Sequence, residues 1–395
     1  MAKVGKITSI LATANLLPGF AATMMGIGFS RFSFTPMSAL MVEKHLLTSQ
    51  DITIIAAFMM AAYAIGAFAA SSLSARFGAV SVVRASFVIV SLGLLAEGIF
   101  AAFLPVLAGR FVMSVAGAVL MVLGPGMILS SIPPERRGFA AGFVFTGIGF
   151  GVVIAGALVA LIASSPIIMV TLVLFVVALG VTALGWKPWP DQKPAAPRAK
   201  TPVFTYGFFG LLLAYGLDAI AFIPHSVYLS DFVASELGHG AKTGGAYWAV
   251  FGIGGIIGAP GSAWLRKVLG GQLSLELVLA LKALFIGVLG FTTDLYFVAI
   301  SAFVVGALVP GIVMLVSTRT ADLVGLDNIT YAWGIMTGAF AIGQFAGATG
   351  MSLAYLGLTK YQPLFAVGGL LEAIGLVALV FSIRLLSSQP KGTSS

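Results

Sequence analysis

Residues 165–186 read SPIIMVTLVLFVVALGVTALGW and contain no charged side chain. The hydrocarbon core of a bilayer is about 30 Å thick, so one helical crossing needs about 20 apolar residues. Backbone polar groups in lipid must hydrogen-bond within the protein, which restricts membrane-spanning structures to helices and closed barrels. A run this long and this continuously apolar does not alternate as barrel strands do. The stretch therefore predicts a transmembrane helix.

Eleven similar stretches flank this one. The chain of 395 residues is 59% hydrophobic and 9% charged, whereas a soluble domain has about 25% charged residues. We therefore expect an all-α membrane protein with twelve transmembrane helices. The first is long enough to be tilted or broken, and it lacks the cleavage site of a signal peptide. The expected spans are 9–41, 51–74, 79–101, 103–129, 138–162, 165–186, 203–229, 242–264, 273–293, 296–318, 329–355 and 363–386.

One polar segment interrupts the apolar pattern near the middle of the chain. Residues 186–202 read WKPWPDQKPAAPRAKTP, which is proline-rich, basic and without periodicity. Such a composition is typical of a semi-extended tether. It predicts an N-terminal six-helix bundle at 1–185, a linker at 186–202 and a C-terminal six-helix bundle at 203–395.

The positive charges predict how the chain lies in the membrane. The sequence has 21 Lys and Arg against 13 Asp and Glu, a net charge of +8. Most of the basic residues fall in loops on one side of the predicted spans, and Lys44, Lys242 and Lys360 fall on the other side. The positive-inside rule then makes both termini and the linker cytoplasmic. The basic residues form small clusters between the spans, which is typical of contact with anionic lipid headgroups. We therefore expect no nucleic acid partner.

The two halves repeat one another in several places. GFSRFSFTP at 28–36 aligns with GLDAIAFIP at 216–224, and PGMI at Pro125 aligns with PGIV at Pro310. The collinear order of these matches indicates a parallel repeat of two six-helix units. In transporters built this way the substrate binds between the units, near the bilayer midplane.

At this point the chain resembles the major facilitator superfamily over nearly its whole length. SSLSARFG at 71–78 resembles the family's GxLaDRxG loop, with Ala75 in place of the usual acid, and GRFVMSVAG places Arg110 where the family has a buried arginine. GIGFSRFSFTP at 26–36 resembles the YbfB/YjiJ-like bacterial branch. The resemblance implies two pseudo-symmetric six-helix bundles, a bacterial inner membrane location and a cavity lined by spans one, four, seven and ten. Because Ala75 replaces the usual acidic residue, a charge-relay gate at this loop is in doubt.

Two opposite charges occupy matched segments of the repeat. Arg31 shares a helix face with Gly28 and Thr35, and its planar guanidinium group suits a carboxylate or phosphate. The alternative is that Arg31 extends to the outer headgroups. Asp218 is the acid deep in the seventh span, and it is either a proton carrier or half of a permanent ion pair. We expect Arg31 and Asp218 to face each other across the cavity.

Five further residues are candidates for substrate contact. Tyr215 and His225 fall near the face of Asp218, although Pro224 can disturb that register. Polar or aromatic side chains in spans two, eight and eleven can contact substrate or bond between helices. These are Tyr63, Trp248 and Gln344.

Four more buried charges need partners. Arg110 has a structural or coupling role, and Glu97 either pairs with it or lies at the membrane surface. Lys282 and Glu372 both reach mid-depth on peripheral spans, which predicts a lateral ion pair. The alternative is that Glu372 alone binds a proton.

We expect a secondary active transporter working by alternating access, which couples a small organic anion to protons. Proton-driven efflux of amphiphilic compounds is the alternative, and a non-transporting membrane sensor or an intramembrane enzyme is an alternative of another class. The chain has no cysteine, its histidines lack metal-ligand spacing, and it has no Walker or nucleophile-elbow sequence. We therefore expect no metal, no cofactor and no enzyme activity. We also expect a monomer, with its substrate, protons and membrane lipids as partners.

Overall fold

The computed structural model describes residues 16–190, 205–325 and 329–388, and within these ranges it is helical without any strand. The all-helical fold class is therefore confirmed for the described chain. The predicted first span is broken, because α2 (Leu17–Thr23) continues into a π-helical turn, η1 (Met24–Phe29), and α3 (Phe34–Glu43) begins after a further turn. The next helices are α4 (Ser49–Phe77), α5 (Ala79–Ile99), α6 (Phe103–Ser130), α7 (Pro134–Ile162) and α8 (Ile167–Gly185).

The second half of the chain begins with another broken segment. Helix α9 (Tyr206–Ala221) leads into the π-helical turn η2 (Pro224–Tyr228), the short α10 (Leu229–Asp231) and η3 (Phe232–Glu236). The remaining elements are α11 (Gly240–Leu269), α12 (Gly271–Gly287), η4 (Val288–Gly290), α13 (Leu295–Val324), α14 (Ile329–Leu358) and α15 (Gln362–Ser388). The aligned segments at 28–36 and 216–224 thus both lie at helix breaks.

Nine helices among the described residues are long and apolar enough to cross a membrane, or ten if α11, which bends by 48° before Pro260, counts as one span. The broken segment 17–43 and the 30-residue α14 are not among them. Twelve spans therefore stay a prediction. The helices that qualify follow the predicted ranges closely, as with α8 inside 165–186.

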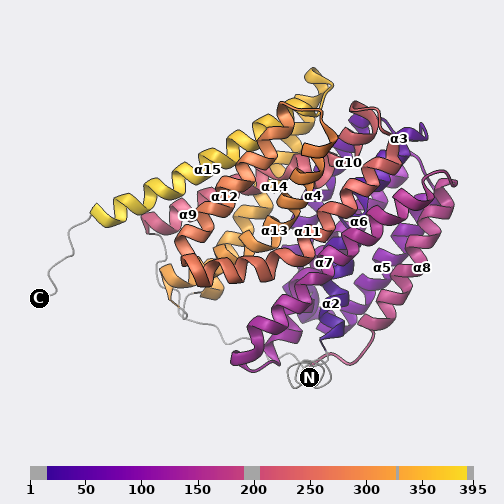
Figure 1. The fold of residues 1–395 in the computed structure, drawn as a ribbon. Helices are drawn as coiled ribbons and strands as arrows, with labels where there is room; N and C mark the ends of the chain where they lie inside the picture. Colours follow the sequence, from indigo (N-terminus) through magenta and orange to yellow (C-terminus); the bar gives the residue numbers. More distant parts are fainter. Residues whose placement is uncertain (1–15, 191–204, 326–328, 389–395) are drawn as a thin grey trace, which may run out of the picture.

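The helices form two groups (Figure 1), and two pairs of long helices make the most extensive contacts between them, with α3 packing on α10 and α11 as well. Helix α4 packs on α6 and α5 on α8, while α9 packs on α15 and α11 on α13. Between the groups, α7 packs on α11 and α4 packs on α14. The predicted division at 186–202 stays a prediction, since residues 191–204 lie outside the described chain.

The contact between α7 and α11 depends on glycine. A Cβ atom at Gly156 would lie 2.6 Å from the backbone nitrogen of Ala249, and one at Gly245 would lie 2.8 Å from the carbonyl oxygen of Gly156. Both distances are shorter than side-chain atoms tolerate, so the two backbones touch directly here. Small residues allow close helix packing of this kind in membranes.

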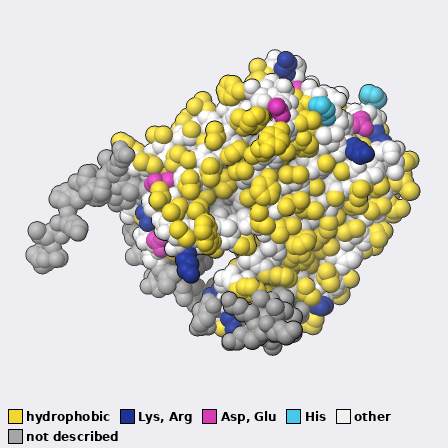
Figure 2. All heavy atoms as spheres, in the orientation of Figure 1, with side chains coloured by type: hydrophobic (Ala, Val, Ile, Leu, Met, Phe, Trp, Pro, Cys, Tyr) yellow, Lys and Arg dark blue, Asp and Glu magenta, His cyan; other side chains and the backbone are white. Residues whose placement is uncertain are grey.

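The surface has the character of a membrane protein. On the face shown in Figure 2, hydrophobic side chains cover most of the molecule and the charged side chains gather towards its ends. Phe291, Leu161 and Tyr296 are 82%, 78% and 71% exposed. Large apolar side chains at this exposure fit contact with lipid.

Candidate functional site

Arg31 lies where the first membrane segment is broken. The π-helical turn Met24–Phe29 ends just before it, and Ser30 and Ser33 donate hydrogen bonds to the carbonyls four residues earlier, at 2.7 and 2.5 Å. π-helical turns are frequent at functional sites. The break turns Arg31 into the protein, where it is 5% exposed, and not towards the headgroups.

The guanidinium group of Arg31 bridges the two groups of helices. Its Nη1 donates a 2.8 Å hydrogen bond to Oε1 of Gln344 on α14. Its Cζ lies 5.8 Å from the ring centroid of Tyr63 on α4 and 5.2 Å from that of Phe32. Its Nε and Nη2 groups have no hydrogen-bond partner among the described residues. Arg31 therefore has unused hydrogen-bond donors at a buried position that side chains from both groups of helices reach.

Aromatic rings border this place on the C-terminal side. The ring of Tyr215 packs on Phe340 and Trp333 of α14, with centroids 4.6 and 6.2 Å apart. Tyr215 also lies near Tyr63 and Asp218. Tyr63 thus lies beside Arg31, and Tyr215 lies on the side of Asp218.

Asp218, Lys282 and Glu372, on α9, α12 and α15, form what we call the carboxyl–lysine cluster. Lys282 Nζ forms an ion pair with Asp218 Oδ1, and both side chains are 1% exposed. Glu372 is fully buried and interacts electrostatically with both partners. Lys282 also lies over the ring of Phe222, 4.9 Å from its centroid.

The partners of these charges differ from two sequence predictions. Asp218 pairs with Lys282 and not with Arg31 across the interface. Lys282, predicted to pair with Glu372, has Asp218 as its ion-pair partner, with Glu372 beside it. The reason is that α9, α12 and α15 pack on one another, so the lysine reaches an acid from each neighbour and the closest pairing stays within one group of helices.

The N-terminal group contains its own buried ion pair. Arg110 on α6 contacts Glu97 on α5 through two bonds, Nε to Oε1 at 3.0 Å and Nη2 to Oε2 at 2.5 Å. Its Nη1 donates to Ser33 Oγ at 2.9 Å, and its Cζ lies 5.1 Å from the ring centroid of Phe34. Arg110 therefore fixes the chain next to the break at Arg31, which fits a structural role.

Two predicted substrate contacts lie elsewhere. His225 Nε2 bonds Ser301 Oγ on α13 at 2.8 Å, and its ring packs edge-on against Phe365 on α15. Trp248 Nε1 donates to the carbonyl of Phe32 at 2.8 Å, and its ring is fully buried. His225 lies in the π-helical turn Pro224–Tyr228, where the regular helix α9 has ended. His225 thus lies inside the C-terminal group, and Trp248 forms a bond between the two groups.

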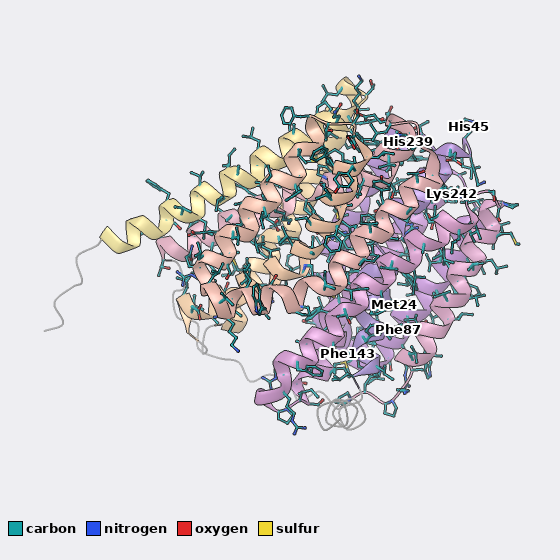
Figure 3. All side chains as sticks on the ribbon, in the orientation of Figure 1. Met24, His45, Phe87, Phe143, His239 and Lys242 are labelled. Carbon is teal, nitrogen blue, oxygen red and sulfur yellow. The ribbon has the colours of Figure 1, made fainter. Side chains whose placement is uncertain are left out.

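Sequence reasoning missed a polar network at one end of the molecule. Asp231 Oδ2 accepts hydrogen bonds from Ser49 Oγ at 2.6 Å and from the hydroxyl of Tyr361 at 2.8 Å. We call these three residues the Asp231 latch, because Ser49 belongs to the N-terminal group and the other two to the C-terminal group. His45, His239 and Lys242 lie at this same end (Figure 3). No repeat or motif in the sequence singles out Asp231.

Further bonds between the groups support the latch. Thr35 Oγ1 donates to the carbonyl of Ser226 at 2.6 Å, and the hydroxyls of Thr53 and Ser352 lie 2.9 Å apart. The backbone N–H of Ala241 donates to Glu43. The two groups are therefore joined closely at the end that carries the α3–α4 connection.

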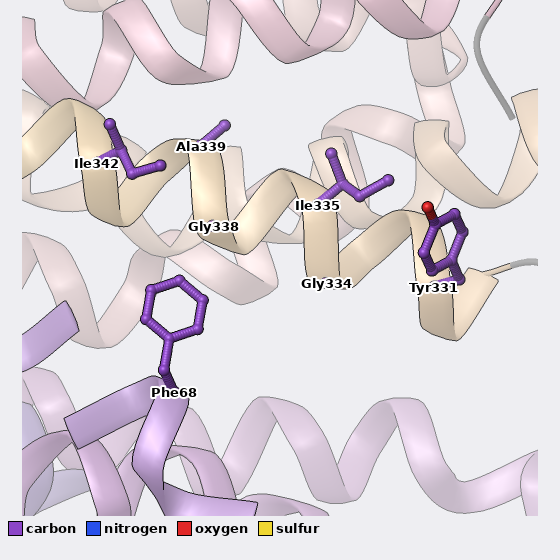
Figure 4. A pocket seen from close by; sticks show the side chains of 7 residues that line it. All are labelled: Phe68, Tyr331, Gly334, Ile335, Gly338, Ala339 and Ile342. Atoms are coloured by element: carbon purple, nitrogen blue, oxygen red, sulfur yellow. The ribbon is translucent and has the colours of Figure 1, made fainter. Parts of the chain in front are cut away.

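A groove lies between α4 and α14, in the part of these helices away from the latch (Figure 4). Its volume is about 520 Å³. Phe68 of α4 faces a glycine-rich stretch of α14, Gly334 to Ala339, with Tyr331 and Ile342 at its ends. The interface is thus joined at one end and grooved towards the other.

The described residues contain no group of three or more His, Cys, Asp or Glu side chains that could hold a metal ion. A family model described as "Uncharacterised MFS-type transporter YbfB" matches residues 23–380. The protein is therefore a multi-pass membrane transporter of the major facilitator superfamily with a small-molecule substrate, and not an enzyme. Within that superfamily it belongs to the YbfB family, which confirms the resemblance seen in the sequence. No curated protein matches the chain.

Proposed function

We propose that the protein carries a small organic anion across the bacterial inner membrane by alternating access, as a monomer, and that transport is coupled to protons. The geometry of Arg31 is the observation that favours an anion as the substrate. A buried guanidinium group with two unused donors, counted over the described residues, is costly unless something binds it. A carboxylate matches the two-point geometry of such a donor pair.

The position of Arg31 supports alternating access. Gln344 reaches it from the C-terminal group and Tyr63 reaches it from the N-terminal group. A substrate bound here would contact both groups of helices, as a binding site between two repeats requires. The Asp231 latch and the groove at α4 and α14 support a conformation that is open towards one side only.

The carboxyl–lysine cluster supports coupling to protons. Ionisable groups buried in a membrane protein are costly and commonly mark proton pathways. Tyr215 lies near Asp218 of this cluster and near Tyr63, which borders the Arg31 site.

Ligand-induced thermal stabilisation of the purified protein tests the anion site, since a ligand that binds the folded state raises apparent stability by mass action. We expect a small carboxylate or organic phosphate from a metabolite panel to stabilise the parent protein and to lose this effect in Arg31→Lys. Arg84→Lys is the matched control, because Arg84 bonds the carbonyl of Trp186 near the surface. Equal stabilisation of parent and Arg31→Lys by every hit would refute the anion site.

The aromatic and apolar lining favours a second candidate, efflux of amphiphilic compounds. Tyr215 packs on Phe340 and Trp333, and the groove is lined by Phe68 and Ile335. In that case neutral or cationic amphiphiles would stabilise the parent and Arg31→Lys to the same extent. The same panel therefore distinguishes the two functions.

The proposed orientation places both termini and the 186–202 linker in the cytoplasm. Because the chain has no cysteine, single cysteines at Lys187 and His239 can be labelled on intact cells with a membrane-impermeant maleimide. We expect labelling at 239 and not at 187. The reverse pattern would invert the orientation.

A further inference from the structure

We propose that Glu372 is the proton-binding site of the transporter, and that in this conformation it is a neutral carboxylic acid that donates its proton to Asp218 Oδ2. The inference rests on the proposed proton-coupled function and deepens it, by naming the group that holds the proton. The sequence pointed to Asp218 on α9 as a proton carrier, whereas this proposal assigns that role to Glu372 on α15.

The hydrogen bonds of the cluster leave one acceptor and one carboxyl group unmatched. Lys282 Nζ bonds Asp218 Oδ1, but Asp218 Oδ2 has no partner in the described part of the chain. Across residues 16–190, 205–325 and 329–388, no side chain or backbone group donates a hydrogen bond to either oxygen of Glu372, and Asp218 is the neighbour with which it can share a proton. Both carboxyl groups are buried, Asp218 to 1% exposure and Glu372 to 0%. Buried polar atoms are almost always hydrogen-bonded, so these atoms need an explanation.

A single proton accounts for all of them. An ionised carboxylate only accepts hydrogen bonds, whereas a protonated one also donates. If Glu372 carries the proton, its O–H group can donate to Asp218 Oδ2, which satisfies both residues at once. With both acids ionised, two like charges would repel each other with no second cation between them.

The charge balance points the same way. One ammonium group and two carboxylates give the cluster a net charge of −1, and protonating one acid makes it neutral. A net charge is strongly disfavoured in an apolar interior. The cluster therefore favours one bound proton.

The position of Lys282 decides which acid holds the proton. A neighbouring cation and a charge-assisted hydrogen bond favour the ionised form of a carboxyl group, and Asp218 has both. Glu372 receives no hydrogen bond from any described residue, and burial favours its neutral form. The proton is therefore placed on Glu372 and not on Asp218.

The surroundings of Glu372 contain few other ionisable groups. Helix α15 packs against α9, α12, α14, η2 and η4. From α9, Tyr215 faces Asp218, and from η2, His225 faces Lys282 and bonds Ser301 on its other side. Among the described residues, Asp218 and Lys282 are the charged groups that act on Glu372. The state of Glu372 thus depends on the cluster itself.

Infrared spectroscopy of the purified full-length protein tests the assignment without a substrate. A protonated carboxyl group has a C=O stretch that is separate from the bands of carboxylates and amides. We expect this band in the parent protein at neutral pH, and we expect Glu372→Gln to lose it. Glu276→Gln is the matched control on α12, because Glu276 accepts its bond from Gln272 on the same helix. A band that survives Glu372→Gln at full intensity would overturn the proposal.

Isotope labelling repeats the test in the parent protein, so it does not depend on how a variant folds. Carboxyl-labelled glutamate should shift the band, and carboxyl-labelled aspartate should leave it in place. A shift with labelled aspartate would place the proton on an aspartate and overturn the assignment.

Transport assays separate this inference from the proposed function. Glu372→Gln should still exchange anion across proteoliposomes but lose accumulation driven by a pH gradient. If the variant accumulates anion as the parent does, the role of Glu372 in coupling is wrong while the transport proposal stands. If the parent itself accumulates no anion under any pH gradient, proton coupling fails, and the assignment of a coupling proton fails with it.

Discussion

Removing the Glu97 carboxylate should destabilise the protein more than most single substitutions. Arg110 is 1% exposed, and Glu97 accepts two of its bonds, at 3.0 and 2.5 Å. In Glu97→Gln the guanidinium group remains charged, because arginine does not lose its proton in proteins. Breaking a buried ion pair from one side costs about 3–5 kcal/mol. We expect about 3 kcal/mol, because Arg110 keeps its bond to Ser33 and its contact with Phe34.

Reversible unfolding of the purified protein in mixed micelles measures this cost. Glu276→Gln, which removes one carboxylate from a part-buried site, should change the free energy of unfolding by about 0.5 kcal/mol or less. The double variant Glu97→Leu/Arg110→Met should recover most of the loss, because it leaves no charge behind. A loss below about 1 kcal/mol in Glu97→Gln, or losses that simply add in the double variant, would refute the reasoning.

Three further predictions concern the carboxyl–lysine cluster, the contact between α7 and α11, and the Asp231 latch. Lys282→Met leaves two buried carboxyl groups, and its folded state must protonate both, one more than the parent does. Its loss of unfolding free energy relative to the parent should therefore grow by about 1.4 kcal/mol per pH unit as pH rises. A loss that is the same at every pH would count against this. Gly156→Leu should push α7 away from α11 and abolish transport, whereas Gly142→Leu, with nothing within 4 Å of its Cβ position, should not; equal activities in a transport assay would argue against direct backbone contact. Asp231→Ala removes the acceptor of the latch, so a cysteine at the buried Met41 should label faster with maleimide than in the parent, and an unchanged rate would mean that the latch does not hold this end closed.

The positions of most helices could be predicted from the sequence because run length determines them. Helix α8 occupies Ile167–Gly185 within the predicted 165–186, and α4 occupies Ser49–Phe77 against the predicted 51–74. The two segments matched in the repeat, 28–36 and 216–224, lie at helix breaks in the structure, whereas the sequence predicted a possible break for the first span alone. Hydrophobicity along the chain is a one-dimensional property, and this part of the fold depends mainly on it.

The partners of the buried charges could not be predicted in the same way. Whether Lys282 meets Asp218 or Glu372 depends on the rotation of three helices, and one residue turns a helix by about 100°. The helix break at Pro224 changes this rotation again, and His225 just after it bonds Ser301 on α13. Matched positions in a repeat placed Arg31 and Asp218 at similar depths but gave no information on which way each side chain turns.

The Asp231 latch could not be predicted from the sequence for a different reason. Ser49, Asp231 and Tyr361 are far apart in the sequence and come from three different helical segments or loops. Each is an ordinary polar residue near the end of a predicted span, where such residues are expected at the membrane surface. Only the packing of the two groups of helices brings them together.

Accumulation of an anion by proteoliposomes containing the purified protein is the most direct test of the central claim. The anion would be one that stabilises the parent in the ligand panel, and an inward proton gradient would be imposed. We predict that the parent accumulates it above its external concentration, that a protonophore abolishes this accumulation, and that Arg31→Lys does not accumulate it. Uptake that ignores both the gradient and the substitution of Arg31 would contradict the account.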